Sequence, residues 1–196
     1  MHVADAQWTV IIPVKPAAIG KSRLGLGPAL GPRLARAIAL DTVAAVVACN
    51  AVERVIVVTA DAEFHPPGAE VLAERSPAGI DAAVAAGAEL AGIGTARAAL
   101  LGDLPSLDPA ELAAALDVAS RSPRAFVPDH EGTGTTLVTA APGIELLTAF
   151  GGGSAAKHRA LGLFELDLPA DSSVRFDVDT PEQLEAARRR GAGHPG

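Results

Sequence analysis

TVIIPV, at residues 9–14, is an uninterrupted apolar run, and RVIVVTA, at residues 54–60, is a second. Both are short and rich in β-branched residues, so each predicts a strand buried on both faces. Longer runs rich in Ala and Leu alternate with these and with further short apolar runs. The alternation predicts an α/β fold with a mixed, mainly parallel sheet and helices on both faces. The other expected elements are strands at 69–74, within 96–105 up to Asp103, and at 125–129, 135–140 and 163–168, and helices at 32–50, 79–91, 109–121 and 180–191.

Local signals place several helix ends. Pro32 suits the first turn of the helix at 32–50, and Asp108 suits the N-cap of the helix at 109–121. Thr180 suits the N-cap of the last helix, and Gly191 follows its end. The alanine spacing within 79–91 predicts that this helix packs closely against the sheet.

Composition limits the class of protein. The chain has 196 residues, of which 49% are hydrophobic and 20% charged, so we expect residues 1–196 to form one domain with 191–196 as a loose tail. The formal net charge of −7 argues against a nucleic-acid partner, which requires a basic face. The apolar run at 42–52 is too short for a spanning helix, which needs roughly 20 residues. The sequence therefore predicts a soluble, cytoplasmic protein with no membrane partner, in which Cys49, the single cysteine, is a small buried apolar residue.

The loop after the first strand, PVKPAAIGKSRLG at 13–25, concentrates positive charge. It contains the tripeptide GKS, but a P-loop needs a glycine where Lys15 stands, and the glycines at 25–31 lack the spacing of the dinucleotide fingerprint. Lys15, Lys21 and Arg23 would repel one another at a strand's carboxyl end unless an anion lay between them. The loop predicts a triphosphate site; the alternative is a solvated basic loop.

Carboxylates follow two other predicted strands. Asp103 lies in LLGDLP, and Asp177 and Asp179 lie two residues apart in FDVDT, a spacing that puts both on one face of an extended chain. Such carboxylates repel without a cation, and Mg²⁺ accepts carboxylate and phosphate oxygens. These residues predict a magnesium site. The alternative is that Asp103 forms a turn, Asp179 caps the last helix and Asp177 is solvated.

The second half of the chain offers hydrogen-bond donors. Residues 129–138 contain the hydroxyls of Thr133, Thr135 and Thr136, and the glycine run of FGGGSAAKHR at 150–159 precedes a helix expected to open at Ser154. Backbone N–H groups in such a run bind anions, although a plain turn is the alternative. The G-x-S-x-G pattern of serine hydrolases is missing around Ser154. His158, between a lysine and an arginine, is expected at the surface.

Five short motifs then stand in the order found in one family. They are P-V-K…K-S-R-L within 13–24, G-D-L-P at 102–105, G-T-G-T at 132–135, F-G-x-x-S at 150–154 and D-V-D-T-P at 177–181. Together they cover nearly the whole chain, which resembles the guanylyltransferases of deazaflavin coenzyme (F-420) biosynthesis. That family joins GMP from GTP to a small phosphorylated three-carbon acid and releases pyrophosphate. One departure is the run of three glycines at 151–153, which predicts a looser acid-binding loop.

The resemblance implies a single-domain, Rossmann-like nucleotidyltransferase that uses GTP and Mg²⁺, or Mn²⁺ in its place. It implies metal binding by Asp103, Asp177 and Asp179, and acid binding by Thr135, Gly151 and Ser154. It implies nucleotide binding by Val14, Lys15, Lys21 and Arg23, and catalytic roles for Lys15, Lys21, Arg23 and Asp103. The excess of Ala, and of Arg over Lys, suggests a GC-rich genome of the actinobacterial kind. In that branch the resemblance implies phosphoenolpyruvate rather than 2-phospholactate as the acid.

Two other functions remain open from the sequence. One is a related nucleotidyltransferase that acts on a sugar phosphate or a molybdopterin, and the other is a non-catalytic nucleotide-binding domain. The sequence does not show which residues select guanine, how many metal ions bind, or whether the chain forms a homo-oligomer.

Overall fold

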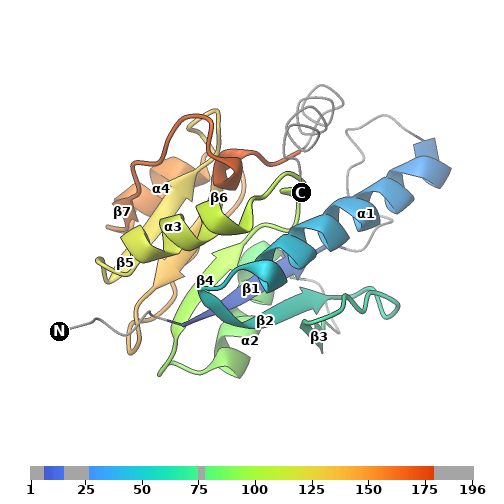
Figure 1. Ribbon diagram of the computed structural model, residues 1–196, viewed down its shortest axis with the longest axis horizontal. Coiled ribbons are helices and arrows are strands. Elements are labelled where there is room, and N and C mark those ends of the chain that lie inside the picture. The colour runs from blue at the N-terminus through green and yellow to red at the C-terminus, as the bar shows by residue number, and fades with distance from the viewer. Residues whose placement is uncertain (1–6, 16–26, 75–77, 179–196) are drawn as a thin grey trace.

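The computed structural model describes residues 7–15, 27–74 and 78–178 of the chain. The strands are β1 (Trp8–Val14), β2 (Val52–Thr59), β3 (Glu70–Ala73), β4 (Ala96–Leu100), β5 (Arg124–Pro128), β6 (Thr135–Ala140) and β7 (Phe164–Glu165). The helices are α1 (Gly27–Ala48), α2 (Ile80–Ala91), α3 (Pro109–Ala119) and α4 (Ser154–Ala160), with a 3-10 helix η2 (Ser173–Arg175) after them. The described strands form one sheet in the order β3-β2-β1-β4-β6-β5-β7 (Figure 1). Only β6 among them runs antiparallel to its neighbours, which confirms the mixed, mainly parallel sheet.

Helices cover both faces of the sheet, as the uninterrupted apolar runs predict. Alternate residues of β1 show why: Val10 and Ile12 pack into the cluster that holds Val43 of α1, together with α3. Ile11 points to the other face and packs with Ala83 of α2. α4 lies on the same side as α2, so the sheet is the middle of three layers (Figure 1).

Three further expectations, on packing, helix capping and burial, are confirmed. α2 lies so close to the sheet that a Cβ on Gly87 would stand 2.5 Å from the Ile11 side chain. Asp108 caps α3, since its Oδ1 accepts from Ala110 N at 2.7 Å. Cys49 is buried with 2% exposure and forms no disulfide.

Several predicted boundaries are wrong. α1 begins at Gly27, so Pro32 lies in its second turn, where its missing N–H removes a hydrogen bond only near the helix end. β4 ends at Leu100, and Asp103 therefore lies in the following loop. β7 has two residues instead of the six at 163–168, because it is an edge strand of the described sheet and only Phe164 and Glu165 pair with β5. The predicted helix at 180–191 lies outside the described residues.

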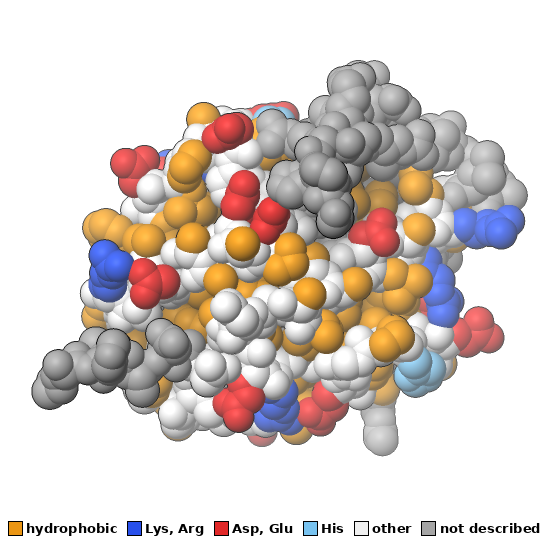
Figure 2. Space-filling view, viewed as in Figure 1, with side chains coloured by type: hydrophobic (Ala, Val, Ile, Leu, Met, Phe, Trp, Pro, Cys, Tyr) orange, Lys and Arg blue, Asp and Glu red, His pale blue; other side chains and the backbone are white. Residues whose placement is uncertain are grey.

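The surface and the helix lengths add two observations. Acidic and basic side chains of the described residues are interspersed among apolar ones on the face shown in Figure 2, so this face carries no continuous basic surface. Among the helices of the described ranges, none combines the length and the apolar character needed to cross a bilayer.

Candidate active site

A cavity of about 610 Å³ opens where β1 and β4 end. It is the place where a parallel sheet commonly binds ligands, at the carboxyl ends of its strands. Its lining brings together, from segments far apart in the sequence, seven of the residues singled out above: Val14, Lys15, Asp103, Thr135, Gly151, Ser154 and Asp177. Lys21, Arg23 and Asp179 lie outside the described residues.

The β1 side of the cavity carries the positive charge. Lys15 follows the last residue of β1 and is exposed, so its ammonium group is available to an anion in the cavity. Gly102 lies against this strand end: a Cβ there would stand 3.1 Å from the Val14 side chain and 3.3 Å from the Pro13 carbonyl oxygen. A residue without a side chain therefore lets the loop that carries Asp103 approach Lys15.

Main-chain hydrogen bonds hold the loop of Asp103. Leu104 N donates to the hydroxyl oxygen of Thr42 at 3.0 Å, and that fully buried hydroxyl donates to Ile38 O within α1 at 2.9 Å. Val178 N donates to the Asp103 carbonyl oxygen at 2.9 Å. This last bond places Asp177 next to Asp103 on the cavity wall.

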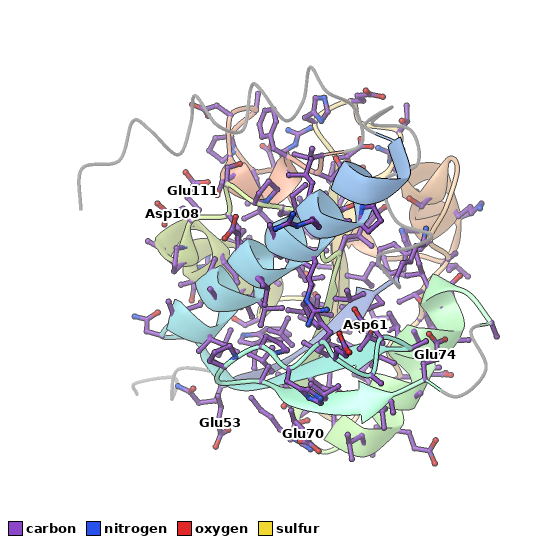
Figure 3. All side chains as sticks on the ribbon, turned by 90° about the vertical axis from the view of Figure 1, so that its right-hand side faces the viewer. Glu53, Asp61, Glu70, Glu74, Asp108 and Glu111 are labelled. Carbon is purple, nitrogen blue, oxygen red and sulfur yellow. The ribbon has the colours of Figure 1, made fainter. Side chains whose placement is uncertain are left out.

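The segment before Asp177 is fastened to α3. Glu111 Oε2 accepts from Ser173 N at 2.5 Å and from Ser173 Oγ at 2.8 Å, and Ser173 Oγ also accepts from Asp108 N at 2.9 Å. Figure 3 shows Asp108 and Glu111 together beside α3. The contacts fix η2 and hence the direction in which the chain reaches Asp177, whose side chain is 16% exposed.

The two carboxylates fit a magnesium ion that shares its coordination with a substrate. Mg²⁺ is commonly held by one or two carboxylates together with substrate phosphates and waters. Asp103 and Asp177 supply two such groups in the lining of the cavity, which also contains the exposed Lys15. Within the described residues no set of three His, Cys, Asp or Glu side chains converges, and Asp179, the third expected ligand, is not among them.

The turn between β5 and β6 is held by Asp129. Its Oδ1 accepts from Thr133 N at 3.0 Å and its Oδ2 accepts from Gly134 N at 2.8 Å. A Cβ on Gly134 would stand 2.3 Å from that oxygen, so the turn requires glycine. The threonines that follow differ in role: Thr135 lines the cavity, whereas the Thr136 hydroxyl donates to Val174 O at 2.6 Å and is not available to a ligand. The expectation that Thr136 offers its hydroxyl is therefore wrong.

The glycine segment lies beside this turn, since Ala155 N, just after it, donates to Thr133 O at 3.1 Å. Gly151 has φ +104° and Gly153 has φ +67°, backbone conformations that favour glycine, whereas Gly152 has no such requirement. Ser154 N donates to Gly151 O at 3.0 Å, so the hydroxyl rather than the amide of Ser154 is free to meet a ligand.

The sequence interpretation of His158 is wrong. Its side chain is fully buried, with Nδ1 2.9 Å from Thr135 Oγ1 and Nε2 3.0 Å from Ala149 N. The charged neighbours Lys157 and Arg159 suggested an exposed position for His158, but neighbouring residues of a helix point to different sides. The available signal was the spacing of Ser154, Ala155 and His158, which share the buried face of α4.

Solved structures identify the fold class. A nucleotidyl transferase from Methanothermobacter superposes with a TM-score of 0.66 at 17% identity, covering 96% of this chain and 99% of that one. A Mycobacterium tuberculosis protein solved in complex with manganese has a TM-score of 0.56 at 15% identity, covering 93% and 97% of the two chains. The sheet and its helices are thus those of the nucleotidyltransferase class.

Sequence relatives identify the family, although no protein-family model matches the chain. The phosphoenolpyruvate guanylyltransferase of Streptomyces coelicolor is 51% identical over 198 residues, which cover 95% of this chain and 92% of the relative. The chain belongs to the phosphoenolpyruvate guanylyltransferase family. It is an enzyme, and the alternative of a non-catalytic nucleotide-binding domain is wrong.

Proposed function

We propose that this enzyme transfers GMP from GTP to phosphoenolpyruvate and releases pyrophosphate. The observation that carries the proposal is that one cavity is lined by a cation, two acidic residues, Thr135 and Ser154. Both reactants are anions, so the site needs positive charge for the phosphate chain and neutral donors for the acid. Relatives named for this activity, at 41–51% identity, support the choice of substrates.

In the proposed reaction a phosphate oxygen of phosphoenolpyruvate attacks the α-phosphorus of GTP. The new P–O bond forms as the bond between the α-phosphorus and the bridging oxygen to the β-phosphorus breaks, and pyrophosphate leaves with that oxygen. Lys15 would bind the triphosphate and orient it, together with Lys21 and Arg23 if the resemblance holds for them. The attacking phosphate is already ionised near neutral pH, so no side chain has to remove a proton.

Asp103 and Asp177 would hold the divalent cation, with Asp179 as the third ligand expected from the motif. A bound Mg²⁺ or Mn²⁺ would neutralise charge on the phosphates as the reaction proceeds. The carboxylates themselves, anchored through Val178 N and Leu104 N, would fix where that charge is placed.

The acid would lie against the wall formed by Thr135 and the glycine segment. The Thr135 and Ser154 hydroxyls can donate to carboxylate or phosphate oxygens, with Gly151 giving the backbone close approach. Neither hydroxyl separates planar phosphoenolpyruvate from tetrahedral 2-phospholactate strongly, since close analogues differ by only about 1–3 kcal/mol in such pockets. The product would enter biosynthesis of coenzyme F-420, and the 196 residues would form one domain.

A pyrophosphate-release assay with each nucleoside triphosphate against a panel of phospho-acids tests the proposal. We expect turnover with GTP and phosphoenolpyruvate, loss of turnover with a chelator, and recovery with Mg²⁺ or Mn²⁺. In direct competition with limiting GTP, mass analysis should show the phosphoenolpyruvate product in excess over the lactyl product. Turnover that resists the chelator contradicts the metal role, and a dominant lactyl product contradicts the choice of acid alone.

A further inference from the structure

The buried ring of His158 connects two segments that line the cavity, the start of β6 and the glycine segment. Its centroid lies 5.6 Å from that of Phe126 and 5.5 Å from that of Phe150. One ring nitrogen, Nδ1, contacts the hydroxyl of Thr135 at the start of β6, and the other, Nε2, contacts Ala149 N just before the glycine segment. Both ring nitrogens are therefore occupied by groups of the protein.

These partners determine where the ring carries its proton. The backbone N–H of Ala149 can only donate, so Nε2 must accept with its lone pair. A neutral imidazole has one protonated nitrogen, which must then be Nδ1. Desolvation by burial lowers the pKa of His158, against the opposing charge of Asp81, and so favours the neutral ring. Nδ1–H therefore donates to Thr135 Oγ1 over 2.9 Å.

The Thr135 hydroxyl is oriented as a consequence. Its oxygen accepts from His158, so its own proton points away from the ring. Thr135 lines the cavity, and no acceptor for this proton is seen among the residues that the structure describes. We infer that His158 is a positioning residue, which fixes the Thr135 hydroxyl as a hydrogen-bond donor to an anionic oxygen of the acceptor acid. This inference rests on the proposed function, in which that acid is phosphoenolpyruvate.

The same ring sets the distance between the two acid-binding segments. Ala149 N is held by His158, and the next amide, Phe150 N, donates to Asp81 Oδ1 at 3.0 Å. The entry to the glycine segment is therefore fixed by two side chains, one from α4 and one from α2. Thr135 and the glycine segment share one rigid support, which a site for a small acid requires.

Two substitutions separate the two hydrogen bonds of the ring. His158→Asn places an amide nitrogen near the position of Nδ1 and keeps a donor for Thr135. His158→Gln reaches the position of Nε2 and keeps an acceptor for Ala149 N, but leaves Thr135 without its donor. We expect His158→Gln to raise KM for phosphoenolpyruvate about tenfold, the effect of misorienting one hydrogen bond to a charged group. His158→Asn should raise it much less, and KM for GTP should change little in either variant.

The split between the two KM values and a double-mutant cycle distinguish positioning from a merely structural role. A structural role predicts that both variants shift both KM values together, whatever their Tm. If His158 acts through Thr135, His158→Gln should raise KM for phosphoenolpyruvate no further in a Thr135→Val background. Equal effects of Asn and Gln, or additive effects in the cycle, would overturn the inference.

Ring-nitrogen NMR tests the orientation without relying on turnover. In ¹⁵N-labelled protein near neutral pH, long-range ¹H–¹⁵N correlations should show His158 with a protonated Nδ1 and a bare Nε2, and His158→Asn identifies the signal by its loss. A proton on Nε2, or on both nitrogens, would contradict the inference. Wild-type protein that shows the expected tautomer but does not turn over GTP and phosphoenolpyruvate would instead contradict the proposed function.

Discussion

The two walls of the cavity are held in different ways. On the carboxylate wall, the loop of Asp103 is held through its own main chain: Val178 N donates to the Asp103 carbonyl oxygen, and Leu104 N donates to the Thr42 hydroxyl. On the acid wall, side chains hold one another or nearby amides, as His158 does for Thr135 and Asp129 does for its turn. The bonds of the carboxylate wall thus act on the main chain of the Asp103 loop, whereas the His158 bond acts on the Thr135 side chain that would meet the acid.

This difference separates side chains that would take part in the reaction from side chains that hold other groups in place. Replacing a carboxylate oxygen on the first wall should remove function and leave the fold, because the bonds just named use the main chain of the Asp103 loop. Changing a polar group on the second wall should alter substrate affinity and stability together, because buried polar networks are expensive to leave half-satisfied. Variants on each wall test the contrast.

Asp103→Asn should give the largest loss. The amide keeps the shape of the side chain but removes a charge that the proposed cation needs, so kcat should fall about 100-fold or more. Tm should stay within a few degrees of the wild type, measured by thermal unfolding. Asp177→Asn should act similarly, and the double variant should lose less than the product of the single losses. Unfolding of Asp103→Asn at room temperature, or fully multiplicative losses, would contradict a shared charge site.

Gly151→Ala should have the next largest effect and should act on the acid. Gly151 has φ +104°, which a side chain strains at a cost of about 1–3 kcal/mol. We expect KM for phosphoenolpyruvate to rise about tenfold with a smaller change for GTP, as steady-state kinetics with each substrate varied would show. Gly152→Ala is the matched control, since no atom lies within 4 Å of its added Cβ and its φ is ordinary, and it should change KM much less. Equal effects of the two would show that the loop tolerates the strain.

The sequence predicted which residues line the cavity better than it predicted the contacts that hold them in place. The apolar runs at 9–14 and 54–60 predicted a sheet covered on both sides because burial on both faces leaves an uninterrupted pattern. Asp103 and Asp177 were singled out because carboxylates brought together at strand ends repel one another without a cation. These residues come together at one cavity.

The contacts that hold the site residues in place could not be predicted, because they join residues that are far apart in the sequence. Thr42 is hydrogen-bonded to Leu104, which lies 62 positions away in the sequence, and His158 is hydrogen-bonded to Thr135, which lies 23 positions away. No local pattern signals such pairs, and the charged neighbours of His158 suggested the surface instead. The start of α1 was misplaced at Pro32 because Pro28, which lies in the first turn of the helix, suits a helix start equally well.

Thr42→Val tests the backbone frame of the carboxylate wall. It keeps the shape of the side chain but leaves the buried Leu104 N–H without its acceptor, which should lower the free energy of unfolding by about 1–3 kcal/mol. The loop of Asp103 should loosen, so kcat should fall severalfold while KM for phosphoenolpyruvate changes little. Denaturant unfolding and kinetics measure both effects. Thr42→Ser, which keeps the hydroxyl, should recover most of each loss, and failure to do so would show that methyl packing is what matters.

The smallest expected effect is the pH dependence that His158 gives to stability. Its pKa is lowered in the folded protein by burial, whereas the unfolded chain has the ordinary value of about 6.5. As pH falls below about 6.5 the unfolded state gains a proton that the folded ring resists, so the free energy of unfolding should decrease, by at most about 1.4 kcal/mol per pH unit for one group. Above that pH the ring is neutral in both states and contributes no slope. Denaturant unfolding of the wild type and of His158→Asn between pH 5.5 and 8 isolates this contribution, because all other titrating groups are common to both. The difference in free energy of unfolding between them should be constant at the upper end and shrink below pH 6.5; parallel curves over the whole range would mean that the buried ring accepts a proton as readily as the unfolded chain does.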